Sequence, residues 1–306
     1  MIIVDTSQCV LGCLHVYDGP ELKKGADLQQ TSKLLKHMFY NQLLSYSRKH
    51  KKKFGNIVLA CDGKNYWRKE IFPVYKGHRA VDRQESDFNW TAIYSAVDDI
   101  KAEVKKNFPY KVLEYDRAEA DDINAVLVKY LQDHELVSEG LFDSEPQPIL
   151  LITSDTDAYQ LHRFKNVKQW SPILKVFVGP KTTPEKYLLE HIATGDGGDN
   201  IPNVLTSDQW SIDRSNGVKP KRQKSMYAER LEGFLSDGKS HCQDDFEREN
   251  WDRNELLVSF DKIPEDVSTS IINKYLECEV EGNKSRLLNY FMSQGMRQLI
   301  QDVQDF

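Results

Sequence analysis

Two aspartates one residue apart, Asp155 and Asp157, come shortly after the apolar residues 149–152. A short apolar run is typical of a buried strand, and ligands of open α/β sheets bind just beyond the carboxyl ends of the strands. Carboxylates at such an edge can hold hard divalent cations that promote hydrolysis of phosphate esters. Alternatively, Ser154 or Asp155 caps a helix that begins near Ala158. The pair alone therefore does not decide the chemistry.

An apolar run that ends in an acid also occurs twice earlier in the chain. Asp5 and Asp62 each end such a run, and three further acids open a segment of helical periodicity: Glu119, Asp121 and Asp122. An acid in a first helical turn gains about 0.3–1 kcal/mol from the helix dipole. Three acids packed together also repel one another, which points to a shared cation.

The last acidic motif, residues 195–202, reads Gly-Asp-Gly-Gly-Asp-Asn-Ile-Pro and follows a segment of helical periodicity. Gly197 and Gly198 would let backbone amides approach a ligand closely. Asp196 and Asp199 are three residues apart, and from this turn they could reach back toward the strand ends.

The segments between these acids have the patterns of alternating strands and helices. Apolar residues recur at helical spacing over about residues 30–48 and 90–107. Residues 110–115 have the pattern of a strand, and residues 166–170 with 174–178 that of a hairpin. Such alternation indicates βαβ units and a largely parallel sheet. The carboxyl ends of parallel strands share one edge, so we expect the acids to converge there.

The remaining segments are less regular. We expect helices at about residues 268–278 and 287–301, and loops at 133–148, 206–225 and 236–250. The last residues, 301–306, are expected to be frayed, although their composition also resembles a sliding-clamp-binding tail.

Nine carboxylates of the acidic motifs are therefore expected close together. Without a cation such crowding is destabilising, because each carboxylate disfavours ionisation of the others. Oxygen ligands with no nearby cysteine or histidine select Mg²⁺, with Mn²⁺ as a substitute, over zinc. Two such ions about 3.5–4 Å apart can activate water and stabilise the leaving oxygen in phosphoryl transfer.

The formal net charge of −6 argues at first against binding to nucleic acid. The distribution of charge indicates the opposite, because residues 48–83 contain 11 Lys/Arg against 3 Asp/Glu, and residues 214–224 contain 5 Lys/Arg and no acid. A cation-loaded acidic pocket with basic segments suits a polyanionic substrate. The basic cluster at 48–53 by itself also fits an ordinary solvated surface.

Cysteine usage and hydropathy indicate a soluble protein of a reducing compartment such as the cytoplasm. The five cysteines include no Cys-x-x-Cys pair and predict neither a disulfide framework nor a zinc site, and Cys9 and Cys13 are expected to be buried. No apolar run approaches the length of a membrane span, and residues 1–5 lack the basic region of a signal peptide. His50 and His78 have no ligand-like partners, so we expect both at the surface.

The order of the acidic motifs resembles that of the flap endonuclease / 5′→3′ exonuclease (FEN/XPG-like) superfamily. Within it the chain is most similar to the ribonucleases H of T-even bacteriophages, as Tyr66-Trp67-Arg68 and residues 166–172 also indicate. The matching positions are Asp5, Asp62, Glu119-Ala120-Asp121-Asp122, Thr153-Ser154-Asp155-Thr156-Asp157 and Gly195-Asp196-x-x-Asp199-Asn200-Ile201-Pro202.

This resemblance implies an α/β fold whose mostly parallel central sheet is flanked by helices, the PIN-like core of 5′ nucleases. It places this nuclease domain at residues 1–185, with an arch or bridge at about 64–90. Residues 186–306 are expected to form a smaller, mainly helical DNA-binding domain with a helix–hairpin–helix-like element. The family's glycine-rich continuation is missing after residues 203–204, which leaves open whether residues 195–202 bind a monovalent cation.

Carried over motif by motif, the resemblance assigns two sites for Mg²⁺. The first site takes Asp5, Asp62, Glu119, Asp121 and Asp155. The second site takes Asp157 and Asp199, with Asp122 and Asp196 as outer ligands through water. The implied reaction is in-line attack of activated water on a phosphodiester, which leaves a 5′-phosphate and a 3′-hydroxyl.

Basic and aromatic residues are interleaved between residues 66 and 83. This composition suits a single strand, because cations hold phosphates while rings stack on bases, although an amphipathic surface segment also has it. The family's Tyr-Lys-x-x-Arg pattern matches here, which makes Lys76 and Arg79 candidates for stabilising charge on the scissile phosphate. The expected nucleic-acid contacts are Tyr66, Arg68, Tyr75, Lys76, Arg79, Arg83, Gly197, Gly198, Lys219, Lys221 and Arg222.

The activity that the resemblance implies is that of a structure-specific 5′ nuclease with ribonuclease H, 5′→3′ exonuclease and flap endonuclease activities. Its substrates would be RNA·DNA hybrids and nicked, 5′-flap or forked DNA, and its role the removal of RNA primers from lagging-strand fragments. We expect a monomer, with a single-stranded-DNA-binding protein and a sliding clamp as partners. Two alternatives stay open: a haloacid-dehalogenase-type phosphatase, and a DNA-structure-binding protein without catalysis.

Overall fold

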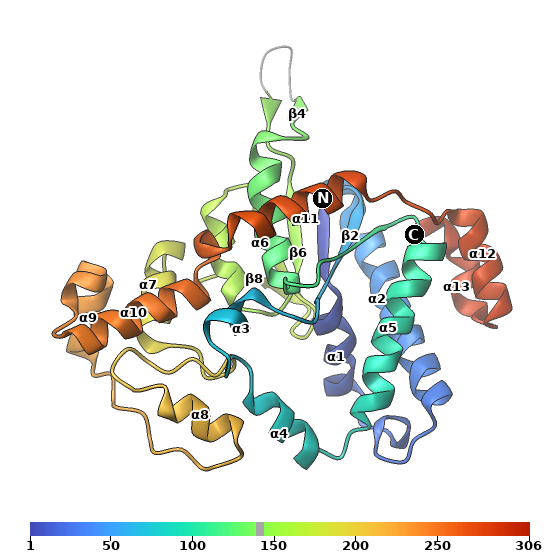
Figure 1. Ribbon diagram of the computed structural model, residues 1–306. Coiled ribbons are helices and arrows are strands. Elements are labelled where there is room, and N and C mark those ends of the chain that lie inside the picture. The colour runs from blue at the N-terminus through green and yellow to red at the C-terminus, as the bar shows by residue number, and fades with distance from the viewer. Residues whose placement is uncertain (139–143) are drawn as a thin grey trace.

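The computed structural model describes residues 1–138 and 144–306 and is built on one six-stranded sheet (Figure 1). The order across the sheet is β3-β2-β1-β6-β7-β8, and every neighbouring pair is parallel except β7 with β8. The predicted α/β fold with a mostly parallel sheet is therefore confirmed. The strands are β1 Ile2–Asp5, β2 Ile57–Cys61, β3 Lys111–Glu114, β6 Ile149–Ile152, β7 Val167–Ser171 and β8 Val176–Val178.

Helices cover both faces of the sheet. Successive side chains of a strand point to opposite faces, so Ile2 and Val4 of β1 join one apolar cluster and Ile3 joins the other. Strands buried on both faces are apolar throughout, which explains the uniform runs in the sequence. The first cluster is completed by α1 Thr6–Val16, α2 Leu28–Phe54 and α5 Trp90–Asn107, and the second by α6 Ala120–Asp133, η2 Asp157–Arg163 and α11 Glu265–Glu277.

A helical region follows β8 and has a small apolar core of its own, around Ile192, Phe234 and Trp251. The chain then returns to the sheet, where Val267 packs in the second cluster and Phe291 in the first. Residues 186–306 thus contribute to both layers around the sheet. Their helices are α7 Pro184–Thr194, α8 Gln209–Ser215, α9 Ala228–Asp237, α10 Asp245–Val258, α11, α12 Lys284–Ser293 and α13 Arg297–Gln301, with 3-10 turns η3 Gly238–His241, η4 Phe260–Lys262 and η5 Val303–Asp305.

The segment between β2 and α5 contains two short helices, α3 Trp67–Ile71 and α4 His78–Glu85. In Figure 1 this segment runs below the sheet from α3 to the foot of α5, with α8 beside α4. The Asn200 side chain donates to the Val74 carbonyl at 2.9 Å. The segment is therefore anchored to the helical region as well as to the sheet.

Two of the segments expected to be loops contain helices. In α10 the buried side chains include polar residues, so the helix lacks an apolar stripe. Asn250 donates to the Val204 carbonyl and Asn254 to the Ile192 carbonyl. The only buried side chain of α8 is Ser211. Both predictions were wrong because polar residues occupy the inward positions.

Smaller differences concern the ends of elements. The helix expected at 287–301 is broken at Gly295, whose φ of +65° ends α12. Within 133–148, β4 Val137–Ser138 pairs with β5 Ser144–Glu145, and residues 139–143 lie outside the described part of the chain.

His50 and His78, expected at the surface, are both buried. Cys9 and Cys13 are buried, as predicted. No described helix is long and apolar enough to cross a membrane.

Residues 301–306 are not frayed, so that prediction was wrong. Phe306 is fully buried and packs against Phe108 and Phe291, with ring centroids 5.5 and 5.4 Å away. Its carbonyl accepts from Lys51 at 3.1 Å. The residues with which Phe306 packs come from distant parts of the sequence, so the sequence pattern of the segment itself does not show its burial.

We expect Phe306→Ala to lower the free energy of unfolding by about 3 kcal/mol, because it leaves a cavity among buried rings. Urea denaturation followed by circular dichroism would measure the change. The control is Phe246→Ala, since Phe246 is 40% exposed. An equal, small effect of both substitutions would show that residues 301–306 contribute little to the core.

Candidate active site

Acids from four separate segments line one cleft at the carboxyl edge of the sheet. The cleft has a volume of about 270 Å³, and Lys76, Arg79 and Tyr66 complete its wall. The predicted convergence therefore holds for the five residues assigned to the first metal site. These are Asp5 at the end of β1, Asp62 after β2, Glu119 and Asp121 at the start of α6, and Asp155 after β6.

Each strand-end acid is held by a backbone amide of the turn or helix that follows a strand. Asp5 Oδ1 accepts from Gln8 N at 2.9 Å, as the N-cap of α1. Asp62 Oδ1 accepts from Ala120 N, and Asp155 Oδ1 from Asp157 N, both at 2.9 Å. The 3-10 turn that follows Asp155 has Thr156 at its N-cap and no side-chain cap, so the capping alternative for Ser154 or Asp155 was wrong. Each of these contacts uses one oxygen of the carboxylate. The second oxygen of each accepts no hydrogen bond from the residues that the structure describes.

Burial and mutual repulsion make these carboxylates difficult to ionise together. Burial, with the charges of Asp62 and Asp155 nearby, raises the pKa of Asp5 well above its usual value. Burial and the charge of Asp155 do the same for the pKa of Asp121. Burial and the neighbouring Asp157 raise the pKa of Asp155 to about 6. A cation in the cleft would remove this repulsion.

Side chains of the segment between β2 and α5 supply part of the positive charge that offsets the repulsion among these carboxylates. Lys76 Nζ lies 2.5 Å from Glu119 Oε1 and 3.4 Å from Asp199 Oδ2. Burial opposes the charged amine, but Asp199 and Glu119 together raise the pKa of Lys76. Arg79 Nη2 lies 2.8 Å from Asp199 Oδ1. Both residues predicted to face the scissile phosphate therefore reach the acids of the cleft.

Tyr75 and Arg68 support the site from behind and have no free access to nucleic acid. The Tyr75 hydroxyl lies 2.8 Å from Glu119 Oε2 and 2.7 Å from Asp199 Oδ2, and the ring is buried. The Arg68 guanidinium is 3% exposed and pairs with Asp122 at 2.8 Å and with Glu119 at 3.2 Å. The expected contacts of Tyr75 and Arg68 with nucleic acid are corrected to roles in orienting carboxylates.

Asp122 lies outside the cleft. Its side chain is fully buried, and Oδ2 accepts from Glu119 N, Trp67 Nε1 and Arg68 Nη1. Asp122 forms the capping box of α6 together with Glu119. This role at the start of the helix is sufficient to explain the acid. The structure thus gives no support to the predicted role of Asp122 as an outer metal ligand.

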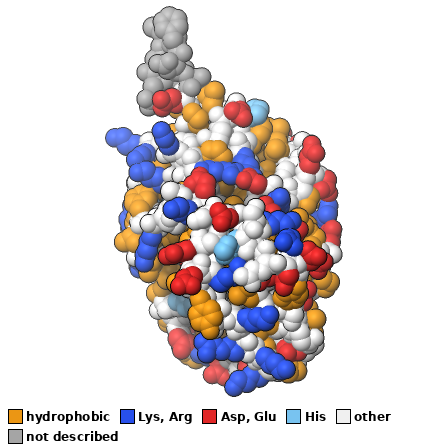
Figure 2. All heavy atoms as spheres, turned by 90° about the vertical axis from the view of Figure 1, so that its left-hand side faces the viewer, with side chains coloured by type: hydrophobic (Ala, Val, Ile, Leu, Met, Phe, Trp, Pro, Cys, Tyr) orange, Lys and Arg blue, Asp and Glu red, His pale blue; other side chains and the backbone are white. Residues whose placement is uncertain are grey.

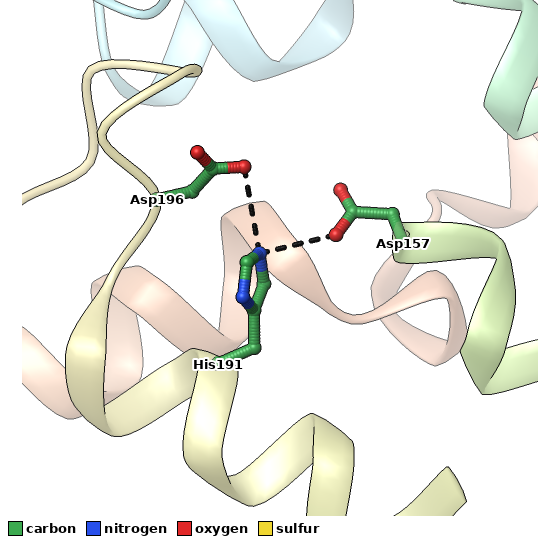
Figure 3. A group of neighbouring side chains, drawn as sticks. All are labelled: Asp157, His191 and Asp196. Carbon is green, nitrogen blue, oxygen red and sulfur yellow. Dashed lines mark ion pairs between the residues drawn. The ribbon is translucent and has the colours of Figure 1, made fainter. Parts of the chain in front are cut away.

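A second acidic group lies on the other side of Asp155. Figure 3 shows Asp157 of η2 and Asp196, which follows α7, pointing at the imidazole of His191 on α7. His191 Nε2 lies 3.1 Å from Asp157 Oδ1 and 3.4 Å from Asp196 Oδ2. Burial disfavours the imidazolium, but the two carboxylates raise the pKa of His191 to about 10. The imidazolium outweighs the effect of burial on Asp196 and lowers the pKa of that carboxyl to about 2.

His191 was missed because the sequence argument assumed no histidine near the acids. The residue is five positions before Asp196, and the helix that separates them ends at Thr194. A histidine in the last turn of a helix before an acidic turn was the available signal. Asp199, assigned with Asp157 to the second site, is instead held by Tyr75, Lys76 and Arg79.

The other predicted contacts lie around the cleft. Arg83 lines a larger groove of about 860 Å³ that continues from Tyr66 past Trp90 and Tyr94. Gly197 and Gly198 are exposed, and their carbonyls accept from Arg214 and Arg79. Two carbonyls of the turn at residues 195–202, which was considered for a monovalent cation, therefore already accept from guanidinium groups.

The basic residues after α8 form a separate exposed stretch. On the face shown in Figure 2, Lys and Arg side chains gather toward the lower end. The predicted contacts Lys219, Lys221 and Arg222 are all exposed. Their position keeps them available to phosphates.

The chemistry of the donor set fits hard divalent cations. The cleft offers carboxylate oxygens without a cysteine among the residues that line it. Two buried atoms of the second group, Asp157 Oδ1 and His191 Nε2, lack a hydrogen bond of ordinary geometry within the described residues. Buried polar atoms are rarely left without a partner unless they bind a ligand or have a function.

The family comparison agrees with this geometry. Residues 1–188 match the model of the 5′-3′ exonuclease N-terminal resolvase-like domain, and residues 182–306 match that of the T4 RNase H C-terminal domain. This chain belongs to the 5′–3′ exonuclease family. The predicted family and enzyme class are confirmed, so the chain is a metal-dependent 5′ nuclease, and the phosphatase alternative is excluded.

One relative and two solved structures are similar to this chain over most of its length. The chain is 30% identical to the ribonuclease H of Enterobacteria phage T4 over 278 residues, which are 89% of this chain and 87% of that protein. The bacteriophage T5 D15 protein co-crystallised with metal ions has a TM-score of 0.60 at 17% identity, with 90% of this chain and 98% of that chain covered. A T5 D15 flap endonuclease variant in complex with DNA and metal ions has a TM-score of 0.59 at 17% identity, with 90% and 97% covered.

We expect Asp155→Asn to stabilise the metal-free protein at pH 7 by about 2 kcal/mol, since a raised pKa means that the folded state disfavours the ionised form. The folded-state pKa of Asp155 is about 6. The gain should be absent below about pH 4, where the carboxyl is protonated in both states, and should grow up to about pH 6. Urea denaturation in EDTA at several pH values measures it. Equal free energies of unfolding for the wild-type protein and Asp155→Asn at pH 7 would show that the folded state does not disfavour the ionised form of Asp155.

Proposed function

We propose that the protein is a Mg²⁺-dependent, structure-specific 5′ nuclease that removes RNA primers of lagging-strand fragments during DNA replication. The observation that carries the proposal is the convergence of Asp5, Asp62, Glu119, Asp121 and Asp155 in one cleft that Lys76 and Arg79 also enter. The similarity to a phage ribonuclease H supports RNA·DNA hybrids as substrates. The fold shared with a flap endonuclease crystallised with DNA and metal ions supports nicked, 5′-flap and forked DNA.

Divalent ions bound in the cleft would supply Lewis-acid activation of water and stabilisation of the leaving oxygen. The five cleft acids would hold one ion, and the group around Asp157 a second. Mn²⁺ would substitute for Mg²⁺, because it accepts the same oxygen ligands. Arg79 and Arg214 already bond two carbonyls of the turn at residues 195–202, so the proposal needs no monovalent cation there.

Lys76 and Arg79 would orient and neutralise the scissile phosphate. The Lys76 amine lies between Glu119 and Asp199 and lines the cleft, so it would lie beside a phosphate bound there. Lys76 has a φ of +55°, a left-handed conformation that is uncommon for residues other than glycine. Its amide donates to the Asp199 carbonyl at 2.9 Å, which holds the backbone in this conformation.

The surrounding surfaces would select the nucleic-acid structure. The groove that Tyr66, Arg83 and Trp90 line continues from the cleft and combines rings with cations, which suits the single-stranded part of a 5′ flap. Gly197, Gly198 and the exposed segment 219–222 would contact the phosphates of the duplex. The protein would act as a monomer in the host cytoplasm, together with a single-stranded-DNA-binding protein and a sliding clamp.

We expect Asp155→Asn to reduce cleavage of a 5′-labelled hybrid or flap to background, while binding of the flap is retained or tightened. The substitution removes a cation ligand and one negative charge that faces the phosphates. Product mapping in Mg²⁺, with binding measured by fluorescence anisotropy in Ca²⁺, separates the two effects. The exposed Asp133→Asn serves as the control. Near-normal turnover by Asp155→Asn would remove this residue from the cation site.

We expect Lys76→Ala to slow the chemical step by about 10²–10³-fold and to change duplex affinity much less, because the amine acts on developing charge. Single-turnover kinetics with saturating enzyme measure the step. Lys106→Ala removes an exposed positive charge on α5 and controls for the loss of charge. A loss of affinity that accounts for the whole effect would reassign Lys76 to phosphate binding alone.

A further inference from the structure

The ligand atoms of Asp157, His191 and Asp196 come close enough together, in the structure as it stands, to share one ion. One atom from each residue lies within 4.8 Å of the other two. Figure 3 shows that the three side chains point toward a common centre from η2, α7 and the turn after α7. Three donors from three elements around one point form the geometry of a cation site rather than a simple ion pair.

The surrounding structure fixes the orientation of each donor. The Tyr187 ring stacks on the His191 ring, with centroids 5.6 Å apart and an interplanar angle of 16°. Tyr187 also packs edge-on against Tyr159 of η2. Asp196 Oδ1 accepts from the amides of Gly198 at 2.6 Å and Asp199 at 3.2 Å, which leaves Oδ2 directed at the imidazole. The donors are therefore held in place without a bound ion.

The imidazole is not satisfied by its neighbours. His191 Nε2 and Asp157 Oδ1 are 3.1 Å apart, but both are buried atoms for which the described residues provide no hydrogen bond of ordinary geometry. A histidine with a purely structural role would use this nitrogen in a well-formed hydrogen bond. Nε2 therefore faces both carboxylates, and a metal ion bound between them would displace its proton and take up the nitrogen lone pair, because a ligating histidine is neutral.

Asp199 is not among the residues whose ligand atoms gather around His191. Its two oxygens lie 2.8 Å from Arg79 Nη2 and 2.7 Å from the Tyr75 hydroxyl. To bind an ion with Asp157 it would have to leave these partners and Lys76. His191 and Asp196 need no such rearrangement.

We propose that His191 is a direct nitrogen ligand of the second cation, together with Asp157 and Asp196, and that it makes this site more selective for transition-metal ions than the all-oxygen cleft. Imidazole raises affinity for Mn²⁺ and Zn²⁺ relative to Mg²⁺, which prefers oxygen. The inference rests on the proposed function, since it concerns the second ion of the same nuclease site. It assigns that ion a ligand set that differs from the one the sequence indicated.

The test uses Mn²⁺ as the probe and the full-length protein. Electron spin echo modulation of bound Mn²⁺ reports whether a ¹⁴N nucleus is coordinated, without any measurement of cleavage. We expect a nitrogen signal in the wild-type protein at two Mn²⁺ per chain. We also expect His191→Ala to lose that signal and to weaken one of two Mn²⁺ sites on the order of tenfold or more in a calorimetric titration.

Two matched variants sharpen the assignment. His15→Gln removes another imidazole that lines the cleft, and it should keep the nitrogen signal. His191→Gln offers an amide oxygen near the position of Nε2, so it should lose the nitrogen signal while the ratio of Mg²⁺ to Mn²⁺ affinity at the second site rises. Circular dichroism of each variant confirms folding, and His191→Gln takes the place of His191→Ala if the alanine variant does not fold.

The outcomes separate this inference from the function on which it rests. Two bound Mn²⁺ without nitrogen coupling would overturn the role of His191 and leave the two-ion nuclease intact. A nitrogen signal that persists in His191→Ala would assign the ligand to another residue and overturn the inference as well. No Mn²⁺ bound to the wild-type protein would overturn both.

Discussion

Repulsion among carboxylates is the constraint on which the structure of this nuclease depends. Parallel strands bring their carboxyl ends to one edge, so acids that end β1, β2 and β6 meet whether or not a cation is present. The fold anchors one oxygen of each strand-end acid on a backbone amide. This anchoring holds the acids in position, and it also prevents them from moving apart to relieve the repulsion.

The protein opposes this repulsion with its own cations, which come from the segment between β2 and α5. Arg68 is buried beside Asp122 and Glu119, and it is a permanent part of the interior. Lys76 and Arg79 instead face the cleft, where a substrate phosphate would compete with the carboxylates for these two cations. Divalent ions would compete with Lys76 and Arg79 for the carboxylates. The position of this segment is therefore linked to the charge state of the site, because a change in one alters the stability of the other.

Features encoded locally were predictable, and those that depend on packing between distant segments were not. The strands and the acids that end them follow from runs such as residues 149–152, because parallel strands covered on both faces are apolar throughout. The helix α10 was not predicted, because Asn250 and Asn254 occupy its inward positions. Their side chains donate to carbonyls earlier in the chain rather than forming an apolar stripe. His191 was missed for a related reason, because its partner Asp157 is 34 positions earlier in the chain and only the docking of α7 on η2 brings the two together.

The burial of the last residues has a mechanical consequence for the helical region. The chain leaves the sheet after β8, builds α7 to α10, and returns through Val267 and Phe306 to opposite faces of the same sheet. The region from α7 to α10 is therefore attached to the sheet at both of its ends and not through a single linker. The packing at both ends limits how far this region can move relative to the sheet. The turn at residues 195–202 is therefore held near the cleft by two attachments rather than one.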